Sequence, residues 1–388
     1  CSSKGTTVID QDTALPETLP PAAADCPEDT ENAVMTSHGC VLGTNSLGLE
    51  YFLNIPYAEP PVDDLRWKRP VSAQVWETPL QADRAGNYCV QFGQNGVVGD
   101  EDCLNLNIIR PLEAEGPLPI LFFTHGGSSI NGSGHQDIYI GNPQLATDAI
   151  VVTYNYRLGA LGFLAHPDLT DEDAEEQGGR GTSGNQGLFD ALMALQWVVD
   201  NAEAFGGDPD QLMIFGESAG GIGTCALLVS PLAEGLFSSA LIQSAGCLFI
   251  NQPLAAATSF SEPAEAQGQR LAEQLDCQDD FLTCLRSATD SEVLQALQEE
   301  SFQPNVDGIF IPSPVGMMME NGDFNRVPIT AGITANEGSL FVRMMEISSQ
   351  AELENTLLEW SPFWGITDTE RLLELYHSED YADPQEAF

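Results

Sequence analysis

Residues 212–220 read Leu-Met-Ile-Phe-Gly-Glu-Ser-Ala-Gly, and this stretch decides the fold class of the chain. Its second half fits the pattern Gly-x-Ser-x-Gly, with Ser218 at the centre. The apolar run 212–215 predicts a buried strand, and the small residues 219–223 predict the start of a helix. A serine on the sharp turn between a strand and a helix presents its hydroxyl outside the sheet, and the flanking glycines relieve crowding there. We therefore predict a nucleophile elbow with Ser218 as the attacking residue.

Strand and helix patterns alternate on both sides of this stretch. Apolar residues recur at steps of three and four from Leu188 to Ala202, which predicts a helix that ends at Gly206-Gly207. This alternation predicts an α/β fold with a mostly parallel central sheet and helices on both faces. Short apolar runs beside turn residues predict five buried strands, at Ile120–Thr124, Ile150–Tyr154, Leu212–Phe215, Ala240–Gln243 and Pro328–Ile333.

The chain divides into two regions of different composition. Residues 1–32 are rich in Pro, Thr, Ala, Asp and Glu without an apolar period, which predicts a flexible N-terminal tether. Residues 33–388 have a globular pattern and form the predicted domain. The whole chain carries 58 acidic and 13 basic residues, for a net charge of −45. Such a charge repels nucleic acid, and it suits either simple solubility or life in salty water, where screening weakens self-repulsion.

Several motifs together resemble the type-B carboxylesterases, the family that includes the cholinesterases. The resemblance covers the chain from about Val34 to its end, and it implies a serine carboxylesterase of the α/β-hydrolase fold that needs neither a metal nor an organic cofactor. One position departs from the family: Asn105 stands where an aromatic residue or threonine is usual. The motifs are Phe205–Gly220, Glu101–Asn107, Asn54–Ala58, Gly184–Leu188 and Gln243–Gly246.

The resemblance also implies roles for individual residues. Ser218 is the nucleophile, and Glu337, in Thr334-Ala335-Asn336-Glu337-Gly338, is the acid that orients the base. The sequence His125-Gly126-Gly127-Ser128 resembles the oxyanion loop, in which the histidine supports the loop and transfers no proton. Ser128 replaces the usual third glycine, so the oxyanion hole, the set of N–H donors that faces the oxyanion, is expected to be narrower or slightly re-aimed. The implied oxyanion donors are the backbone N–H groups of Gly127, Ser128 and Ala219.

The base is the element of the triad that the sequence does not provide. The family places its histidine after the acid, on the order of a hundred residues later in the chain. The only histidine after Glu337 is His377, 40 positions on, and its surroundings do not resemble those of the base. We therefore expect that the C-terminal part of the domain is missing from this chain. A second polypeptide is expected to supply the catalytic histidine.

The nine cysteines favour an exported protein. The start Cys1-Ser2-Ser3 resembles a mature bacterial lipoprotein anchored through Cys1, with an arbitrary start as the alternative, so the protein is expected to be secreted or lipid-anchored. By resemblance, Cys89 pairs with Cys103 and Cys277 with Cys284. A link between Cys26 and Cys40 is a guess, and two further cysteines, Cys225 and Cys247, are expected as buried thiols.

Only thirteen residues separate Cys89 from Cys103, and Phe92 is the sole aromatic residue among them. Cholinesterases have a longer loop with a choline-binding tryptophan here, and the family's lipases have a long apolar lid. The short loop favours a general esterase whose active-site entrance is open and which acts on small-molecule esters. The rival hypothesis is a catalytically silent, cholinesterase-like binding module. Such relatives typically lose the elbow serine, whereas this chain retains Ser218 and Glu337.

Overall fold

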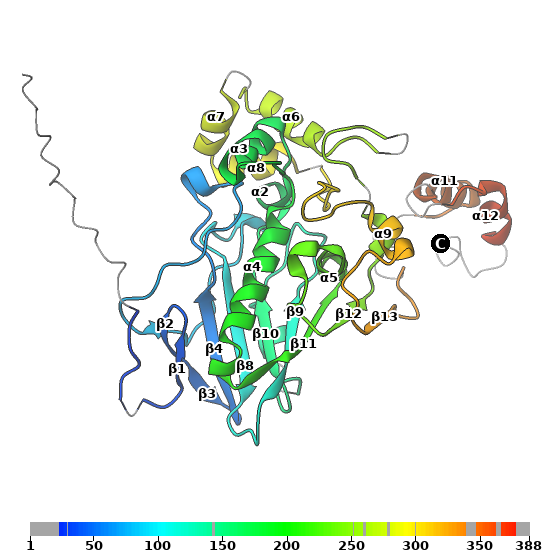
Figure 1. The fold of residues 1–388 in the computed structure, drawn as a ribbon. Helices are drawn as coiled ribbons and strands as arrows, with labels where there is room; N and C mark the ends of the chain where they lie inside the picture. Colours follow the sequence, from blue (N-terminus) through cyan, green and yellow to red (C-terminus); the bar gives the residue numbers. More distant parts are fainter. Residues whose placement is uncertain are drawn as a thin grey trace, which may run out of the picture.

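An eight-stranded mixed sheet forms the centre of the protein in the computed structural model (Figure 1). The structure describes residues 23–28, 30–141, 144–250, 252–258, 261–277, 280–298, 300–338, 347–361 and 366–377. The strands follow the order β13-β12-β11-β9-β10-β8-β4-β3 across the sheet. Their bounds are β3 Thr44–Ser46, β4 Leu49–Pro56, β8 Asn105–Pro111, β9 Leu118–Thr124, β10 Ile150–Tyr154, β11 Gly207–Glu217, β12 Ser239–Gln243 and β13 Ile329–Gly332.

The sheet has a parallel half and an antiparallel half. β10, β9, β11, β12 and β13 pair in parallel, and these are the five strands that the apolar runs predict. β8, β4 and β3 add antiparallel pairs that the sequence pattern did not predict. The prediction of an α/β fold with a mostly parallel sheet is confirmed. The parallel half matters for the site, because the carboxyl ends of parallel strands meet at one edge of the sheet.

Two long helices cover one face of the sheet. α4 (Gln186–Asn201) and α5 (Ala219–Val229) lie side by side in front of β9, β10 and β11 in Figure 1. α4 confirms the predicted helix, and Gly206, with φ 76°, ends the short turn that follows it. The opposite face, in the part of the chain that the structure describes, is covered by α1 (Asp137–Ile140) and by residues around Ala146, which pack on Ile109 and Val151.

Smaller helices gather at one end of the sheet, at the top in Figure 1. They extend the main hydrophobic core beyond the strands through buried side chains such as Leu271, Phe281 and Leu285. Their bounds are α2 Gly159–Phe163, α3 Pro167–Gln177, α6 Glu265–Gln274, α7 Phe281–Ser287 and α8 Asp290–Ala296. Two smaller sheets complete the strands, with β1 Ala33–Thr36, β2 Gly39–Leu42 and β5 Leu80–Gln81 in one and β6 Gln91–Gly93 and β7 Gly96–Val98 in the other.

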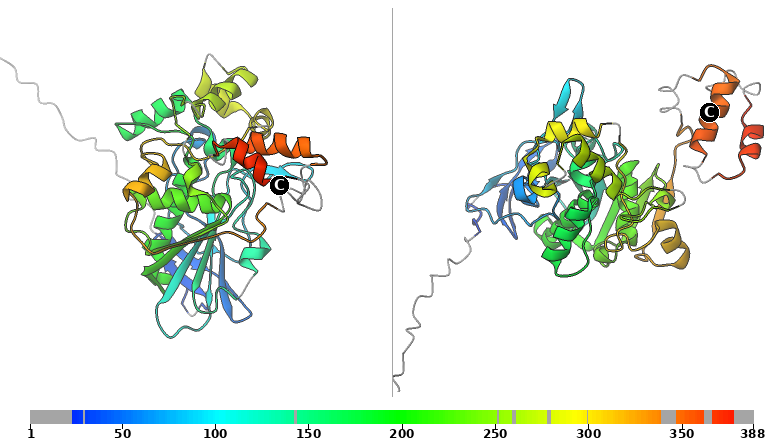
Figure 2. Two further views of the ribbon diagram at one scale, coloured as in Figure 1. Left: turned by 90° about the vertical axis from the view of Figure 1, so that its right-hand side faces the viewer. Right: turned by 90° about the horizontal axis from the view of Figure 1, so that it is seen from above.

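The end of the described chain stands apart from this body. After α9 (Val315–Asn321) and β13, the helices α11 (Gln350–Trp360) and α12 (Thr369–Leu375) share a separate small apolar cluster. Figure 1 and the right-hand view of Figure 2 show this pair outside the main body. β13 is the edge strand of the central sheet, and all four of its residues are exposed.

Four disulfides tie loops to this framework: Cys26–Cys40, Cys89–Cys103, Cys225–Cys247 and Cys277–Cys284. Cys225 and Cys247, which we expected to be two buried free thiols, instead form the third disulfide. The first attaches part of the predicted tether to the domain, and Ala24 N also donates to Trp76 O at 2.7 Å. Such a set of disulfides is typical of exported proteins. Cys1 lies outside the described residues. Among the helices described, none is long and apolar enough to span a membrane.

Candidate functional site

Ser218 occupies a strained turn between β11 and α5. Its backbone has φ 56° and ψ −122°, a combination that residues other than glycine rarely adopt. The Ser218 N–H donates to Gln243 O at 3.0 Å, at the end of the neighbouring strand β12, and α5 begins at the next residue. The turn therefore has the strand, elbow and helix arrangement that presents a nucleophilic hydroxyl.

The two glycines of the motif allow this turn to pack against its surroundings. A Cβ atom on Gly216 would lie 2.3 Å from Gly220 O, and one on Gly220 would lie 2.0 Å from Thr124 O. Both contacts are with backbone atoms, which cannot move aside as a flexible side chain can. Glycine is thus required at both positions by close backbone approach, as the sequence motif predicts.

The predicted oxyanion loop, residues 125–128, follows β9 and lies against the elbow. A Cβ atom on Gly126 would approach Ser218 Cβ to 3.1 Å. The backbone N–H groups of Gly127, Ser128 and Ala219 have no hydrogen-bond acceptor within the part of the chain that the structure describes. Unpaired N–H groups beside a candidate nucleophile are what an oxyanion hole requires.

Ser128 stands where the family has a third glycine, and it adopts a left-handed backbone conformation that glycine would adopt more easily. Its φ is 56°, after 108° at Gly127 and before 59° at Ser129. A left-handed conformation costs a residue other than glycine roughly 1–2 kcal/mol. The loop therefore keeps its donor at position 128 at the expense of backbone strain.

Replacing Ser128 with glycine should relieve this strain. Because glycine also gains entropy in the unfolded chain, we expect the free energy of unfolding to rise by no more than about 1 kcal/mol. The N–H donor is unchanged, so kcat for a short ester should stay within about threefold of the natural protein. Thermal unfolding and steady-state kinetics measure both quantities. A loss of kcat above about tenfold would show that the Ser128 hydroxyl itself contributes to catalysis.

Glu337 lies next to the end of β13 and is held by two donors. Its Oε1 accepts from Ser244 Oγ at 2.5 Å and from Thr334 N at 2.6 Å. These two bonds, with the Ser244 hydroxyl first, hold the pKa of the Glu337 carboxyl below its usual range. Ser244 follows β12, and its own N–H donates to Gly332 O at 2.8 Å. The carboxylate is thus ionised and oriented, as a residue that positions a base must be.

The role of Ser244 was not anticipated from the sequence, although the motif Gln243–Gly246 was noted. The signal that could have revealed it is its position directly after the strand that follows the elbow strand. Parallel strands bring such positions together at their carboxyl ends. A second carboxylate, that of Glu217 on β11, lies near enough for the charge on Glu337 to act on it. Partial burial and then that charge raise the pKa of the Glu217 carboxyl.

None of the five histidines, all within the described residues, donates to or accepts from Ser218 Oγ. His125 is buried, and its Nδ1 contacts Gly126 O at 2.8 Å. His135 is also buried, and its Nε2 contacts Asn105 Oδ1 at 2.5 Å, so Asn105, the residue that departs from the family pattern, supports this ring. Burial lowers the pKa of each of these two rings to about 4, so both are neutral at pH 7. His377 is exposed beside α12.

The remaining two histidines, His38 and His166, make contacts that stabilise the fold. His38 contacts Ser37 and Ser72, and His166 caps α3 and stacks on Phe281 with 3.5 Å between ring centroids. The structure thus brings together the predicted nucleophile, acid and oxyanion donors. It leaves the base unassigned among the residues that it describes.

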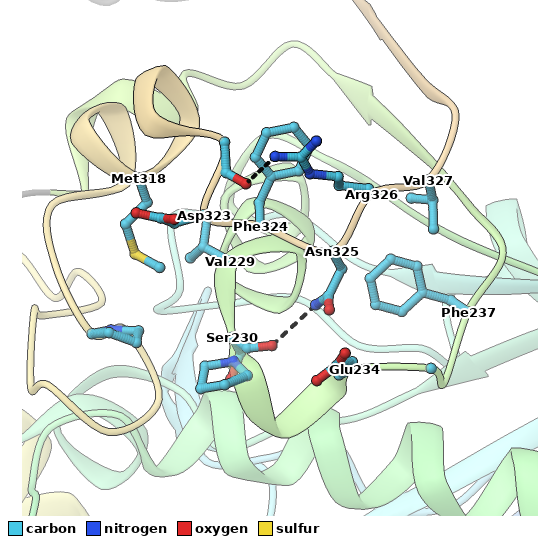
Figure 3. A pocket seen from close by; sticks show the side chains of 14 residues that line it. Val229, Ser230, Glu234, Phe237, Met318, Asp323, Phe324, Asn325, Arg326 and Val327 are labelled. Atoms are coloured by element: carbon cyan, nitrogen blue, oxygen red, sulfur yellow. Dashed lines mark hydrogen bonds between the residues drawn. The ribbon is translucent and has the colours of Figure 1, made fainter.

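A separate hollow of about 710 Å³ lies away from this site, between the end of α5 and the segment that leads to β13 (Figure 3). Asn325 crosses it and donates from Nδ2 to Ser230 O at 3.0 Å, and Phe237 and Met318 form apolar walls. No residue of the elbow, the acid turn or the oxyanion loop lines it. The hollow therefore adds nothing to the chemistry at Ser218.

Comparison with known proteins shows which proteins this chain is similar to. A model of the carboxylesterase family matches residues 30–367. The chain is 34% identical to the fumonisin B1 esterase of Sphingopyxis macrogoltabida, over 92% of this chain and 65% of that protein. It is 36% identical to the para-nitrobenzyl esterase of Bacillus subtilis, over 84% and 68%. The solved carboxylesterase Est55 of Geobacillus stearothermophilus at pH 6.2 is similar with a TM-score of 0.77 and 30% identity, over 92% and 72%.

These relatives correct one prediction. The chain spans about two thirds of the length of the two curated relatives, 65% and 68%. The relatives carry the whole domain, with its catalytic residues, on a single chain. The expectation that a second polypeptide supplies the histidine is therefore wrong. It relied on the spacing after Glu337 in this sequence alone, and that spacing does not distinguish one chain from two.

Proposed function

Because this chain belongs to the carboxylesterase family, we propose that it hydrolyses carboxylic esters through a covalent acyl-enzyme on Ser218. The observation that carries the proposal is the strained elbow, where Ser218 has φ 56° beside three backbone N–H groups that bond to no acceptor among the described residues. The named activities of the relatives share ester hydrolysis and differ in the ester. The class of reaction is therefore better supported than any particular substrate.

The proposed reaction has two steps. In the first, Ser218 Oγ attacks the ester carbonyl while a general base removes its proton. The developing oxyanion is stabilised by the N–H groups of Gly127, Ser128 and Ala219. The C–O bond to the alcohol then breaks, and the proton passes to the departing alcohol. In the second step, water attacks the acyl-enzyme, its proton returns through the base, and the carboxylic acid leaves while Ser218 is restored. Glu337 orients the base and stabilises its charged form.

A serine-directed fluorophosphonate tests this proposal against the silent binding module. The reagent phosphonylates only an activated serine, with loss of fluoride, so a peptide that contains Ser218 should gain the mass of the adduct. Labelling should be saturable and should be slowed by a short ester substrate. An intact protein that acquires no adduct, while a known esterase in the same tube does, would favour the binding module.

The shape of the first disulfide loop predicts substrate size. Between Cys89 and Cys103 the chain forms only the short hairpin of β6 and β7, in which Phe92 is exposed. A hairpin of this length has too little apolar surface to act as a mobile lid. We expect higher kcat/KM for p-nitrophenyl acetate and butyrate than for the palmitate. We also expect no rise in rate as a triglyceride passes its solubility limit. A jump in rate at that limit, followed in a pH-stat, would contradict this prediction.

A further inference from the structure

The turn that carries the oxyanion donors closes on itself within a few residues. Gly127 O accepts from Ile130 N and Asn131 N, both at 3.0 Å. The next residue, Gly132, with φ 115°, packs back on the start of the loop. A Cβ atom on Gly132 would lie 2.5 Å from His125 Nδ1 and 2.6 Å from Gly126 O. The position of Gly132 is therefore directly linked to that of the donors at 127 and 128.

The side-chain amide of Gln91, which lies outside the loop, bonds to both the backbone N–H and the backbone carbonyl of Gly132. Gln91 Oε1 accepts from Gly132 N, and Gln91 Nε2 donates to Gly132 O, each at 2.9 Å. The same Nε2 donates to Cys89 O at 2.9 Å, which ties the amide to the segment directly before β6. Gln91 is buried, and the Cys89–Cys103 disulfide closes the loop from which it projects. No other residue in the described chain bonds both backbone groups of Gly132.

From these contacts we infer that Gln91 is a positioning residue for the oxyanion hole, acting through Gly132 on the N–H groups of Gly127 and Ser128. The inference rests on the proposed function, since an oxyanion hole needs an ester to act on. The physical reason is that catalytic donors must be held within a few tenths of an ångström of the oxyanion position. The buried amide of Gln91 supplies that restraint because both of its bonds to Gly132 are lost if the turn shifts, while the bond to Cys89 O keeps the amide itself in place.

The test compares Gln91→Met, which keeps the length of the side chain and removes its hydrogen bonds, with a matched control. The control is Gln94→Met, three residues further along the same hairpin, where the side chain is exposed. Loss of one complete oxyanion donor costs about 10²–10³ in kcat, so misplaced donors should lower kcat of Gln91→Met by roughly 10–100-fold. KM should change by less than about threefold, because the restraint acts on the transition state. The control should retain the kcat of the natural protein.

Two further measurements distinguish positioning from a loss of stability. A trifluoromethyl ketone forms a tetrahedral adduct with Ser218 whose oxyanion occupies the hole. Its inhibition constant should rise by the same factor as kcat/KM falls. In Gln91→Glu, a protonated carboxyl can still donate to one carbonyl, whereas the carboxylate cannot. Measured where thermal unfolding shows both proteins to be fully folded, the kcat of Gln91→Glu relative to the natural protein should therefore rise as pH falls; a defect confined to stability would leave the kcat of the folded protein unchanged.

The outcomes separate this inference from the proposed function. If Gln91→Met unfolds at a lower temperature but keeps its kcat and its affinity for the ketone, Gln91 supports the fold alone and the inference is wrong. If Gln91→Met does not fold, Gln91→Glu decides, and a pH-independent ratio of kcat values overturns the inference. If the natural protein itself neither hydrolyses esters nor reacts with a fluorophosphonate, the proposed function fails instead.

Discussion

Replacement of Ser218 with alanine is expected to lower kcat for p-nitrophenyl acetate by roughly 10⁶, the scale measured when a serine protease loses its nucleophile. The reason is that no other hydroxyl occupies the elbow beside the unpaired N–H groups. The fold should survive, because Ser218 Oγ makes no hydrogen bond within the described part of the chain, and its removal leaves no group unpaired. The Ser218 N–H, which bonds to Gln243 O, is retained in the variant.

Steady-state hydrolysis, corrected for the uncatalysed rate, checks this prediction. Ser46→Ala is a matched control, since Ser46 is exposed on β3 at the far edge of the sheet. Thermal unfolding of both variants should resemble that of the natural protein. Activity of Ser218→Ala within a few-fold of the control would remove Ser218 from the mechanism and the acyl-enzyme with it.

Replacement of Glu337 with glutamine should lower kcat by roughly 10⁴, the effect of the corresponding acid-to-amide change in a serine protease. Glutamine keeps the shape of the side chain, and its carbonyl oxygen can still accept from Ser244 Oγ and Thr334 N. The turn after β13 should therefore persist while the negative charge is lost. Without that charge, the protonated base that forms during attack is not stabilised.

The pH dependence provides a second check on Glu337. Its folded-state pKa lies below the ordinary value, so its charge is present at neutral pH and is lost only when the pH falls below that depressed pKa. The effect of Glu337→Gln should accordingly be full at pH 7. Glu320→Gln, in an exposed position on α9, is the matched control and should leave kcat unchanged. A loss smaller than about tenfold in Glu337→Gln would assign the orienting role to another carboxylate, of which Glu217 is the nearest in sequence to Ser218.

Sequence reasoning succeeded where local chemistry is decisive, and it was incomplete where a strand lacks a clear pattern. β9 to β13 were predicted because each is a short apolar run beside turn residues. β4 and β8 were not predicted, since Glu50, Asn54, Asn105 and Asn107 interrupt their apolar residues. The side chains of Glu50, Asn105 and Asn107 find their partners only across the fold. Asn54 N donates to Asn107 Oδ1 at 3.0 Å, and Glu50 pairs with Arg110 at 2.5 Å.

The sequence by itself determined the elbow, because steric crowding at a strand-to-helix turn requires glycine two residues before and two residues after the serine. The segments predicted to hold the acid and the oxyanion donors, recognised from motifs a few residues long, follow the strands β13 and β9. The tertiary structure alone decided the Cys225–Cys247 disulfide, the bond from Ser244 to Glu337 across 93 positions, and the hold of Gln91 on Gly132 across 41 positions. These contacts join segments far apart in the chain. They depend on strand register and loop packing, which no local pattern of residues specifies.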